Sequence, residues 1–210
     1  MLARPFRTSP APQGAITAPP DGIVDLPAGK IAAIATYLEL HAPPSGPSPP
    51  PEGSLERITD DLVRYHALYS RVGEPWLWFT RAVMSDEALL RVIAHGDVVA
   101  LALVIDGRDA ALAELDFRRE GECELVFFGL APEWCGRGLG GPLLREALRR
   151  AFARPISRVW LHTCTLDHPA AMPFYMKAGF KPYRRAVEIA DDPRLGGRLP
   201  VSAAPSFPIL

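Results

Sequence analysis

The fold of this chain is decided by the stretch Leu130-Ala-Pro-Glu-Trp-Cys-Gly-Arg-Gly-Leu-Gly-Gly-Pro-Leu-Leu144, which joins a predicted strand to a predicted helix. The residues before it are apolar, β-branched or aromatic, as in a strand, and apolar residues recur after it at helical spacing. Gly136, Gly138 and Gly140 let several backbone N–H groups converge at the helix start, where the helix dipole favours an anion. The sequence therefore predicts a site for a phosphate or pyrophosphate.

Two familiar glycine-loop motifs do not fit this stretch. It lacks the Gly-Lys-Ser/Thr ending of a P-loop and the wider Gly-x-Gly-x-x-Gly spacing of a dinucleotide-binding fold. For the glycines taken alone, a tight turn that binds nothing remains an alternative.

A second motif lies further along, in Val159-Trp-Leu-His-Thr-Cys-Thr-Leu-Asp-His-Pro-Ala-Ala-Met-Pro-Phe-Tyr-Met-Lys-Ala-Gly-Phe180. Its first six residues are typical of a buried strand. Asp167 or His168 is suited to cap a following helix, and Gly179 is suited to end it. This pattern predicts a short helix that carries Tyr175.

Together the two motifs resemble those of the GCN5-related N-acetyltransferases (GNAT). The acyl-CoA loop of that family usually reads Arg/Gln-Gly-x-Gly-x-Gly/Ala, and Cys135 stands here where Arg or Gln is usual. In the second motif an Asn commonly lies seven residues before a Tyr, and His168 occupies that place before Tyr175. The resemblance covers roughly Val98 to Glu188.

The resemblance implies an α/β fold with a mixed, mostly antiparallel central sheet that is flanked by helices and splayed at the acyl-CoA site. The cofactor, acetyl-CoA as a co-substrate, would lie between the strand that ends near Leu130 and the strand that starts near Val159. The cofactor-binding residues expected from the match are Leu130, Cys135, Gly136, Arg137, Gly138, Leu139, Gly140, Gly141 and His168.

Acetyl transfer to an amine needs a base for the attacking amine and an acid for the departing thiolate. Glu124 and Glu122 are two residues apart on one strand, so they face the same side, and we favour Glu124 because it lies nearer the apolar run. Tyr175 matches the thiolate-protonating tyrosine of the family. The alternatives are that the two glutamates are ordinary solvent-facing residues and that Tyr175 is a core aromatic.

The acceptor is expected to bind against the N-terminal third of the chain, where aromatic residues alternate with arginines. We select Tyr65, Trp76, Trp78 and Arg81 as substrate-binding candidates, since such a wall suits an amino acid or a small aromatic amine. A hydrophobic core beneath a solvated charged face explains the same residues equally well.

Periodicity also predicts the remaining elements and the domain organisation. A Pro-rich disordered tail (1–27) should precede one domain (28–190), which the resemblance implies is GNAT-like, and an irregular C-terminal tail (191–210). The expected order is strand, two helices, three antiparallel strands, helix, strand, helix, strand. The segments expected before the glycine loop are a strand at 31–40, helices at 55–70 and 85–94, and strands at 98–105, 110–117 and 122–130.

Composition limits the class of protein. The 210 residues are 48% hydrophobic and 22% charged with a net charge of −1, which suits one enzyme domain and argues against a nucleic-acid partner. Three cysteines without Cys-x-x-Cys spacing predict neither a disulfide framework nor a structural zinc site. His162, Cys164 and His168 are explained without a metal by a strand followed by a helix cap, so we expect no metal.

The absence of a long apolar run or a secretory signal favours a cytoplasmic protein without a membrane partner. A second copy of the chain, forming a homodimer, is a partner to test. The predicted function is acetyl transfer from acetyl-CoA to a primary amine of an unidentified small molecule or peptide by direct attack. The alternatives are a non-catalytic acyl-CoA-binding or regulatory module and, less favoured, a thiol-dependent acyltransferase using Cys135 or Cys164.

Overall fold

One seven-stranded sheet organises residues 21–46 and 49–210, the part of the chain that the computed structural model describes. The strand order is β2-β3-β4-β5-β6-β1-β7, and every neighbouring pair is antiparallel except β5 and β6, which are parallel. The strands are β1 (Lys30–Leu40), β2 (Ser54–Ile58), β3 (Val98–Ile105), β4 (Arg108–Asp116), β5 (Glu122–Leu130), β6 (Arg158–Cys164) and β7 (Lys181–Asp191). The mixed, mostly antiparallel sheet expected from the sequence is confirmed.

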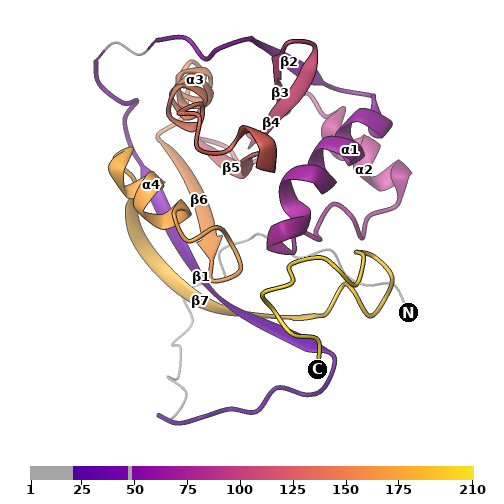
Figure 1. Cartoon of the computed structure of the whole chain (residues 1–210). Coiled ribbons are helices and arrows are strands. Elements are labelled where there is room, and N and C mark those ends of the chain that lie inside the picture. The colour runs from indigo at the N-terminus through magenta and orange to yellow at the C-terminus, as the bar shows by residue number, and fades with distance from the viewer. Residues whose placement is uncertain (1–20, 47–48) are drawn as a thin grey trace.

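Helices cover both faces of the sheet (Figure 1). They are α1 (Leu62–Gly73), α2 (Asp86–Ile93), α3 (Gly140–Phe152) and α4 (Ala171–Lys177), with short 3₁₀ turns η1 (Glu74–Trp76) and η2 (Pro132–Trp134). Side chains of β4 alternate between the two layers: Leu112 packs in the cluster with α1 and α2, whereas Leu115 packs in the cluster with α3 and α4.

The segment expected to be one helix from Leu55 to Ser70 is different, and that prediction is wrong. Residues Ser54–Ile58 form the edge strand β2, whose Leu55 lies opposite Leu103 of β3. Asp61 then caps α1, because its carboxylate accepts a hydrogen bond from the Arg64 N–H at 2.9 Å. The cap fixes the helix start at Leu62 and leaves the preceding residues to pair with the sheet.

The helix predicted to begin after Ser85 is confirmed as α2. The Ser85 hydroxyl accepts a hydrogen bond from the Ala88 N–H at 3.3 Å, which satisfies one of the free donors of the first turn. Among the described helices, none combines the length and the apolar character needed to cross a membrane.

Two irregularities in the sheet meet near the middle of β5. A bulge separates the pairs Glu114–Phe127 and Leu115–Leu125, so that Val126 is the extra residue on β5. On its other side, β5 pairs with β6 only over Glu122–Glu124 against Arg158–Trp160. Beyond Glu124, β5 continues beside β4 and β6 continues beside β1, so the sheet is splayed as expected.

The C-terminal segment from Asp192 onward contains no helix or strand. It is held by Arg194, which forms a buried ion pair with Asp192 and donates to the carbonyls of Ala203 and Phe207. Its apolar residues pack with Leu77, Ala33 and Leu166. The boundaries predicted at 1–27, 28–190 and 191–210 stay a prediction, and residues 1–20 lie outside the described part.

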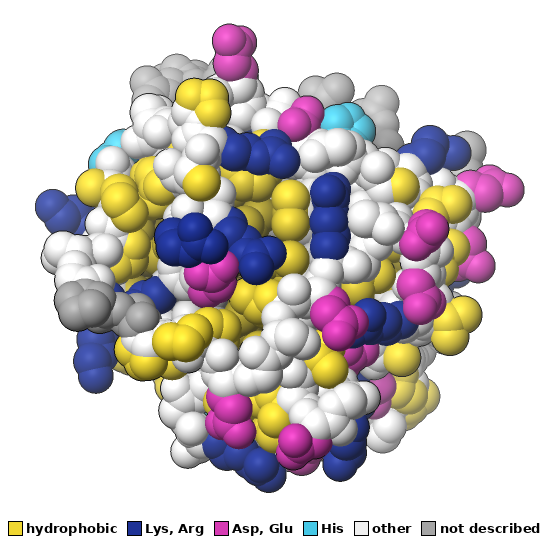
Figure 2. Space-filling model, turned by 90° about the horizontal axis from the view of Figure 1, so that it is seen from above, with side chains coloured by type: hydrophobic (Ala, Val, Ile, Leu, Met, Phe, Trp, Pro, Cys, Tyr) yellow, Lys and Arg dark blue, Asp and Glu magenta, His cyan; other side chains and the backbone are white. Residues whose placement is uncertain are grey.

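On the face shown in Figure 2, Lys and Arg side chains (dark blue) are interspersed with Asp and Glu side chains (magenta). This view shows no continuous field of one charge of the kind that a nucleic-acid backbone would need.

Candidate active site

The glycine loop follows β5 and leads into α3. Gly136 and Gly138 have φ of +75° and +79°, in the left-handed region that favours glycine. A Cβ built on either residue meets no heavy atom within 4 Å. Glycine is therefore required here by backbone conformation, and the space beside the loop is open.

The N-terminus of α3 has no side-chain cap. Its N-cap residue, Leu139, makes no capping hydrogen bond, and the first turn carries no acidic residue. The free N–H donors and the positive dipole end of this 13-residue helix remain for an anion. Gly140 and Gly141 lie in the first turn, and Gly140 packs beside Leu130 and Phe174.

Two side chains of the loop are engaged locally. The Cys135 sulfur lies 3.7 Å from the carbonyl oxygen of Ala131, and the Arg137 guanidinium lies over the Trp134 ring at 4.7 Å from its centroid. Both interactions brace the loop from outside and leave the backbone N–H groups of the glycines uninvolved in them.

Glu124 is the last residue of β5 that pairs with β6, where it lies opposite Trp160. It is only 7% exposed, and its Oε1 atom has no hydrogen-bond partner among the described residues. Burial raises the pKa of Glu124 to about 8, helped by the nearby carboxylates of Asp116 and Glu114 and opposed by Arg81 and Arg118. The splay thus begins at a carboxyl group that exchanges its proton near neutral pH.

Glu122 lies two pairs earlier, opposite Arg158, and has a different environment. Its carboxylate forms ion pairs with Arg158 at 3.0 Å and with Arg119 at 3.4 Å. Arg158 also pairs with Glu39 of β1 at 2.8 Å. Glu122 is therefore part of a charge network that ties the paired ends of β5 and β6 to β1.

Tyr175 lies in α4 and is 8% exposed. Its ring packs against Phe174 and Phe180, and it approaches Phe128 of the splayed part of β5 with centroids 6.3 Å apart. Burial raises the pKa of Tyr175, so the phenol keeps its proton at neutral pH.

The turn before α4 differs from the predicted cap, because neither Asp167 nor His168 caps the helix. The N-cap residue is Ala170, and it makes no side-chain capping bond. The His168 ring instead accepts from the Ala170 N–H at 3.0 Å and meets the Trp76 ring edge-on at 5.0 Å. Asp167 does not cap α4 because its carboxylate turns back toward β6.

Asp167 joins this turn to the loop after α1. Its Oδ2 atom accepts from the Cys164 N–H at 2.8 Å and the Thr163 hydroxyl at 2.9 Å, and its Oδ1 atom accepts from Trp78 Nε1 at 3.1 Å. Trp76 and Trp78 are both partly buried, and through these contacts they border the same turn.

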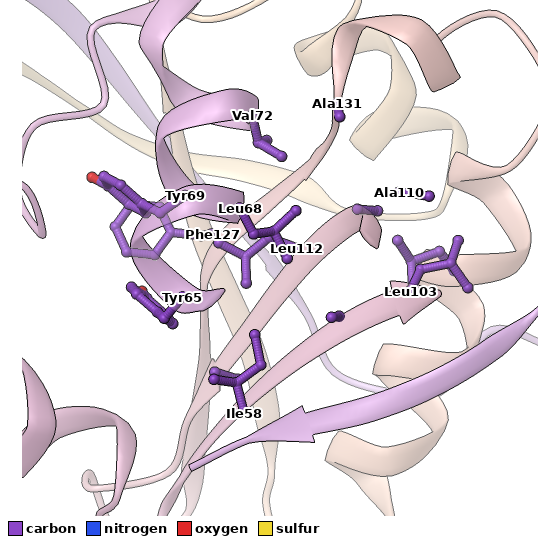
Figure 3. Packing of buried hydrophobic residues seen from close by; sticks show 14 of the residues in the cluster. Ile58, Tyr65, Leu68, Tyr69, Val72, Leu103, Ala110, Leu112, Phe127 and Ala131 are labelled. Carbon is purple, nitrogen blue, oxygen red and sulfur yellow. The ribbon is translucent and has the colours of Figure 1, made fainter. Parts of the chain in front are cut away.

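Tyr65 and Arg81 converge on a carboxylate that sequence reasoning missed, Glu114 of β4. Glu114 is fully buried, accepts from the Tyr65 hydroxyl at 2.5 Å, and pairs with Arg81 at 2.5 Å. Figure 3 shows Tyr65 and Tyr69 projecting from α1 toward the sheet, near Phe127. Tyr65 is fully buried, so it contacts Glu114 rather than solvent.

A single signal was available for Glu114 and Asp116: two acidic residues interrupt an apolar strand, Ala110-Ala-Leu-Ala-Glu-Leu-Asp116. Both carboxylates face the side of the sheet that bears Glu124, and both raise its pKa. The structure therefore brings Glu124, Glu114, Arg81 and Tyr65 together on one side.

Cys135 and Cys164 have raised thiol pKa values, whereas an activated nucleophilic cysteine has a lowered one. Burial raises the pKa of the Cys135 thiol and raises that of Cys164 to about 12. Within the described ranges, no three His, Cys, Asp or Glu side chains are grouped as a metal would require.

Comparison with known proteins agrees with this geometry. The model of the acetyltransferase (GNAT) family matches residues 55–180, more than half of the chain. No curated protein matches the sequence.

Among solved structures, a GNAT-family protein from Novosphingobium aromaticivorans is 23% identical with a TM-score of 0.55, covering 78% of this chain and 67% of its own. A GCN5-related N-acetyltransferase from Sphaerobacter thermophilus is 19% identical with a TM-score of 0.53, covering 76% of this chain and 51% of its own. The PaiA N-acetyltransferase of Thermoplasma acidophilum, solved with coenzyme A, is 21% identical with a TM-score of 0.50, covering 66% of this chain and 99% of its own. At these identities the structures show a common fold.

The family match spans both sequence motifs, the splayed strands and the glycine loop. The chain therefore belongs to the acetyltransferase (GNAT) family and is an acyl-CoA-dependent acetyltransferase.

Proposed function

We propose that this protein transfers an acetyl group from acetyl-CoA to a primary amine of a small molecule or peptide by direct attack of the amine. The observation that carries the proposal is Glu124, a buried carboxyl group with an unpartnered oxygen at the residue where β5 and β6 separate. Its pKa of about 8 suits a base that works near neutral pH.

The cofactor site that we propose is the glycine loop together with the splay. Backbone N–H groups from Gly136 to Gly141 would hold the pyrophosphate, because the turn is left-handed, open and followed by an uncapped helix. When bound, acetyl-CoA supplies the thioester that the amine attacks. Leu130 and His168 would border the chain of the cofactor from the two sides of the splay.

Glu124 would accept the proton that the attacking amine loses, directly or through one water. As the carbon–sulfur bond breaks, the thiolate would take a proton from the Tyr175 phenol, which burial keeps protonated. Glu114 would not serve as the base, because Arg81 and Tyr65 already occupy both of its oxygens.

The acceptor would approach from the side of the sheet that bears Glu124. Trp76 and Trp78 are the aromatic candidates with exposed surface there, and Tyr65 and Arg81 would act through Glu114. The partners in this proposal are acetyl-CoA, an amine acceptor and a second copy of the chain, in a reducing cytoplasm that suits three free cysteines.

Release of coenzyme A thiol in the presence of a panel of primary amines tests the proposal. Amine-dependent thiol release with an acetylated product is the expected result. Tight acetyl-CoA binding without thiol release would instead identify a non-catalytic binding module. Acetyl-labelled protein would identify a covalent route through a cysteine, which the raised thiol pKa values oppose.

A further inference from the structure

Strand β7 ends the sheet and leaves one edge without a neighbouring strand among the described residues. Figure 1 shows it as the outermost strand beside β1. With eleven residues, Lys181–Asp191, β7 is longer than most strands. A long open edge is a template for pairing with another strand.

The β1–β7 end of the sheet also carries exposed apolar side chains on one face. Ile34 is 51% exposed, and its register partner Val187 is 68% exposed. Ile189, two residues further along the same face, is 52% exposed. An edge strand that stays solvated would ordinarily place charged residues at such positions.

The backbone direction identifies which residues of β7 face the open edge. The Asp192 N–H donates to the Gly29 carbonyl at 2.9 Å, so residue 192 points toward β1. Successive residues of β7 point their N–H and C=O groups alternately toward β1 and toward the open edge, since the register is unbroken from Lys30–Asp191 to Tyr37–Arg184. The backbone groups of Arg185, Val187 and Ile189 therefore point outward.

The sequence of β7 is complementary to itself when two copies run antiparallel about Ala186. Arg184 then lies opposite the partner's Glu188, and Glu188 lies opposite the partner's Arg184. Arg185 lies opposite the partner's Val187, and these are outward-facing residues that form a hydrogen-bonded pair. The two copies of Ala186 meet on the axis as a close, non-hydrogen-bonded pair, where a small side chain fits.

We propose that two copies of this chain associate through β7, antiparallel about Ala186, to form one continuous fourteen-stranded sheet from two seven-stranded ones. Two Arg184–Glu188 pairs fix the register. Val187 of each copy meets its counterpart diagonally across the new strand pair. The interface is isologous, so it closes at the dimer. This inference does not rest on the proposed acetyl transfer.

Charge reversal in the full-length chain tests the register by sedimentation velocity. Arg184→Glu places two carboxylates opposite each other, and Glu188→Arg places two guanidiniums opposite each other. Each variant should weaken dimerisation by about ten- to a hundredfold, because two attractive pairs become repulsive. A 1:1 mixture of the two variants should recover the dimer, since both cross-strand pairs are then attractive. Arg145→Glu, on the exposed surface of α3, should leave the dimer unchanged.

A second measurement does not depend on the charge variants being folded. In a Cys135→Ala background with oxidised glutathione, Ala186→Cys should form a disulfide between two chains, because the paired Cα atoms would lie about 4.5 Å apart. Val201→Cys, a more exposed position in the C-terminal segment, should not. A wild-type chain that stays monomeric at about 100 μM, a range typical of weak association, would overturn the proposal. So would a dimer that survives both single reversals, or a mixture that stays monomeric.

Discussion

Replacing Glu124 by glutamine keeps the shape of the side chain and removes its ability to take a proton. We expect kcat to fall by about two to four orders of magnitude at neutral pH, the usual contribution of a positioned base. Acetyl-CoA affinity should be preserved, because the glycine loop and the start of α3 bind the phosphates. Glu122→Gln is the matched control on the same face, and it should keep most of the activity because Glu122 is held in ion pairs.

The pH dependence gives the same prediction a second, independent test. The active form of Glu124 is the ionised one, and its pKa is about 8. Wild-type kcat should therefore rise about tenfold per pH unit below that value and level off above it. Glu124→Gln should lose this rise. Stopped-flow detection of coenzyme A thiol between pH 6 and 9.5 measures both curves.

Stability should change in the opposite direction from activity. Below pH 4.5, the ordinary pKa for Glu124, the carboxyl is protonated in both the folded and the unfolded chain and has no effect. Between that value and about 8 the unfolded chain has released a proton that the folded protein still holds, so stability falls as pH rises. The full difference is about 5 kcal/mol, and glutamine removes it.

Glu124→Gln should therefore unfold at a higher temperature than the wild type at pH 9, by about 10–20 °C, and at nearly the same temperature at pH 4.5. Differential scanning calorimetry measures both. Full activity in Glu124→Gln together with loss in Glu122→Gln would refute the reasoning and move the base two residues back. If the difference in melting temperature between Glu124→Gln and the wild type were the same at pH 9 and at pH 4.5, the buried, proton-holding state of Glu124 would be refuted.

Three further substitutions test the rest of the site. Gly138→Val should weaken acetyl-CoA binding at least about tenfold in calorimetry, because φ of +79° strains a β-branched residue, whereas Cys135→Ala should have little effect; equal, small effects would remove the phosphate assignment. Tyr175→Phe keeps the ring packing against Phe174 and Phe180, so it should slow pre-steady-state acetyl transfer by roughly ten- to a thousandfold without changing acetyl-CoA affinity; a wild-type rate would leave Tyr175 a packing residue. Tyr65→Phe should lower the free energy of unfolding in urea by about 1–3 kcal/mol, because it deprives an oxygen of buried Glu114 of its donor; an unchanged midpoint would show that the bond contributes nothing.

The sequence was informative where the determinant is local. The glycine turn, α3 and the strand before them each follow from neighbouring residues, and the structure has them where they are expected. Periodicity alone misled at Leu55, where the same apolar spacing fits a helix and a short edge strand. There the Asp61 cap and the pairing of Leu55 with Leu103 decided the structure, and only the first of these is visible in the sequence.

The sequence could not predict which side chains from distant parts of the chain would meet. Nothing near Glu114 shows that Arg81 and Tyr65, 33 and 49 residues away, will meet it in the core. The sequence predicts Asp167 as a helix cap because Asp favours that place, but its carboxylate accepts from Thr163 and Cys164 of β6 and from Trp78, 89 residues away. In both cases at least one partner of the carboxylate comes from an element that is distant in the sequence.

The position of Glu124 follows from how the sheet comes apart. The bulge that leaves Val126 unpaired against β4 increases the local twist of β5 just beyond Glu124. On the other edge, the pairing of β5 with β6 ends at Glu124 itself. If β5 paired fully on both sides, there would be no space for a substrate beside Glu124. If the gap were wider, water would reach the carboxyl group and lower its pKa. The splay thus opens the acyl-CoA site and keeps its first residue in the buried environment that raises its pKa to about 8.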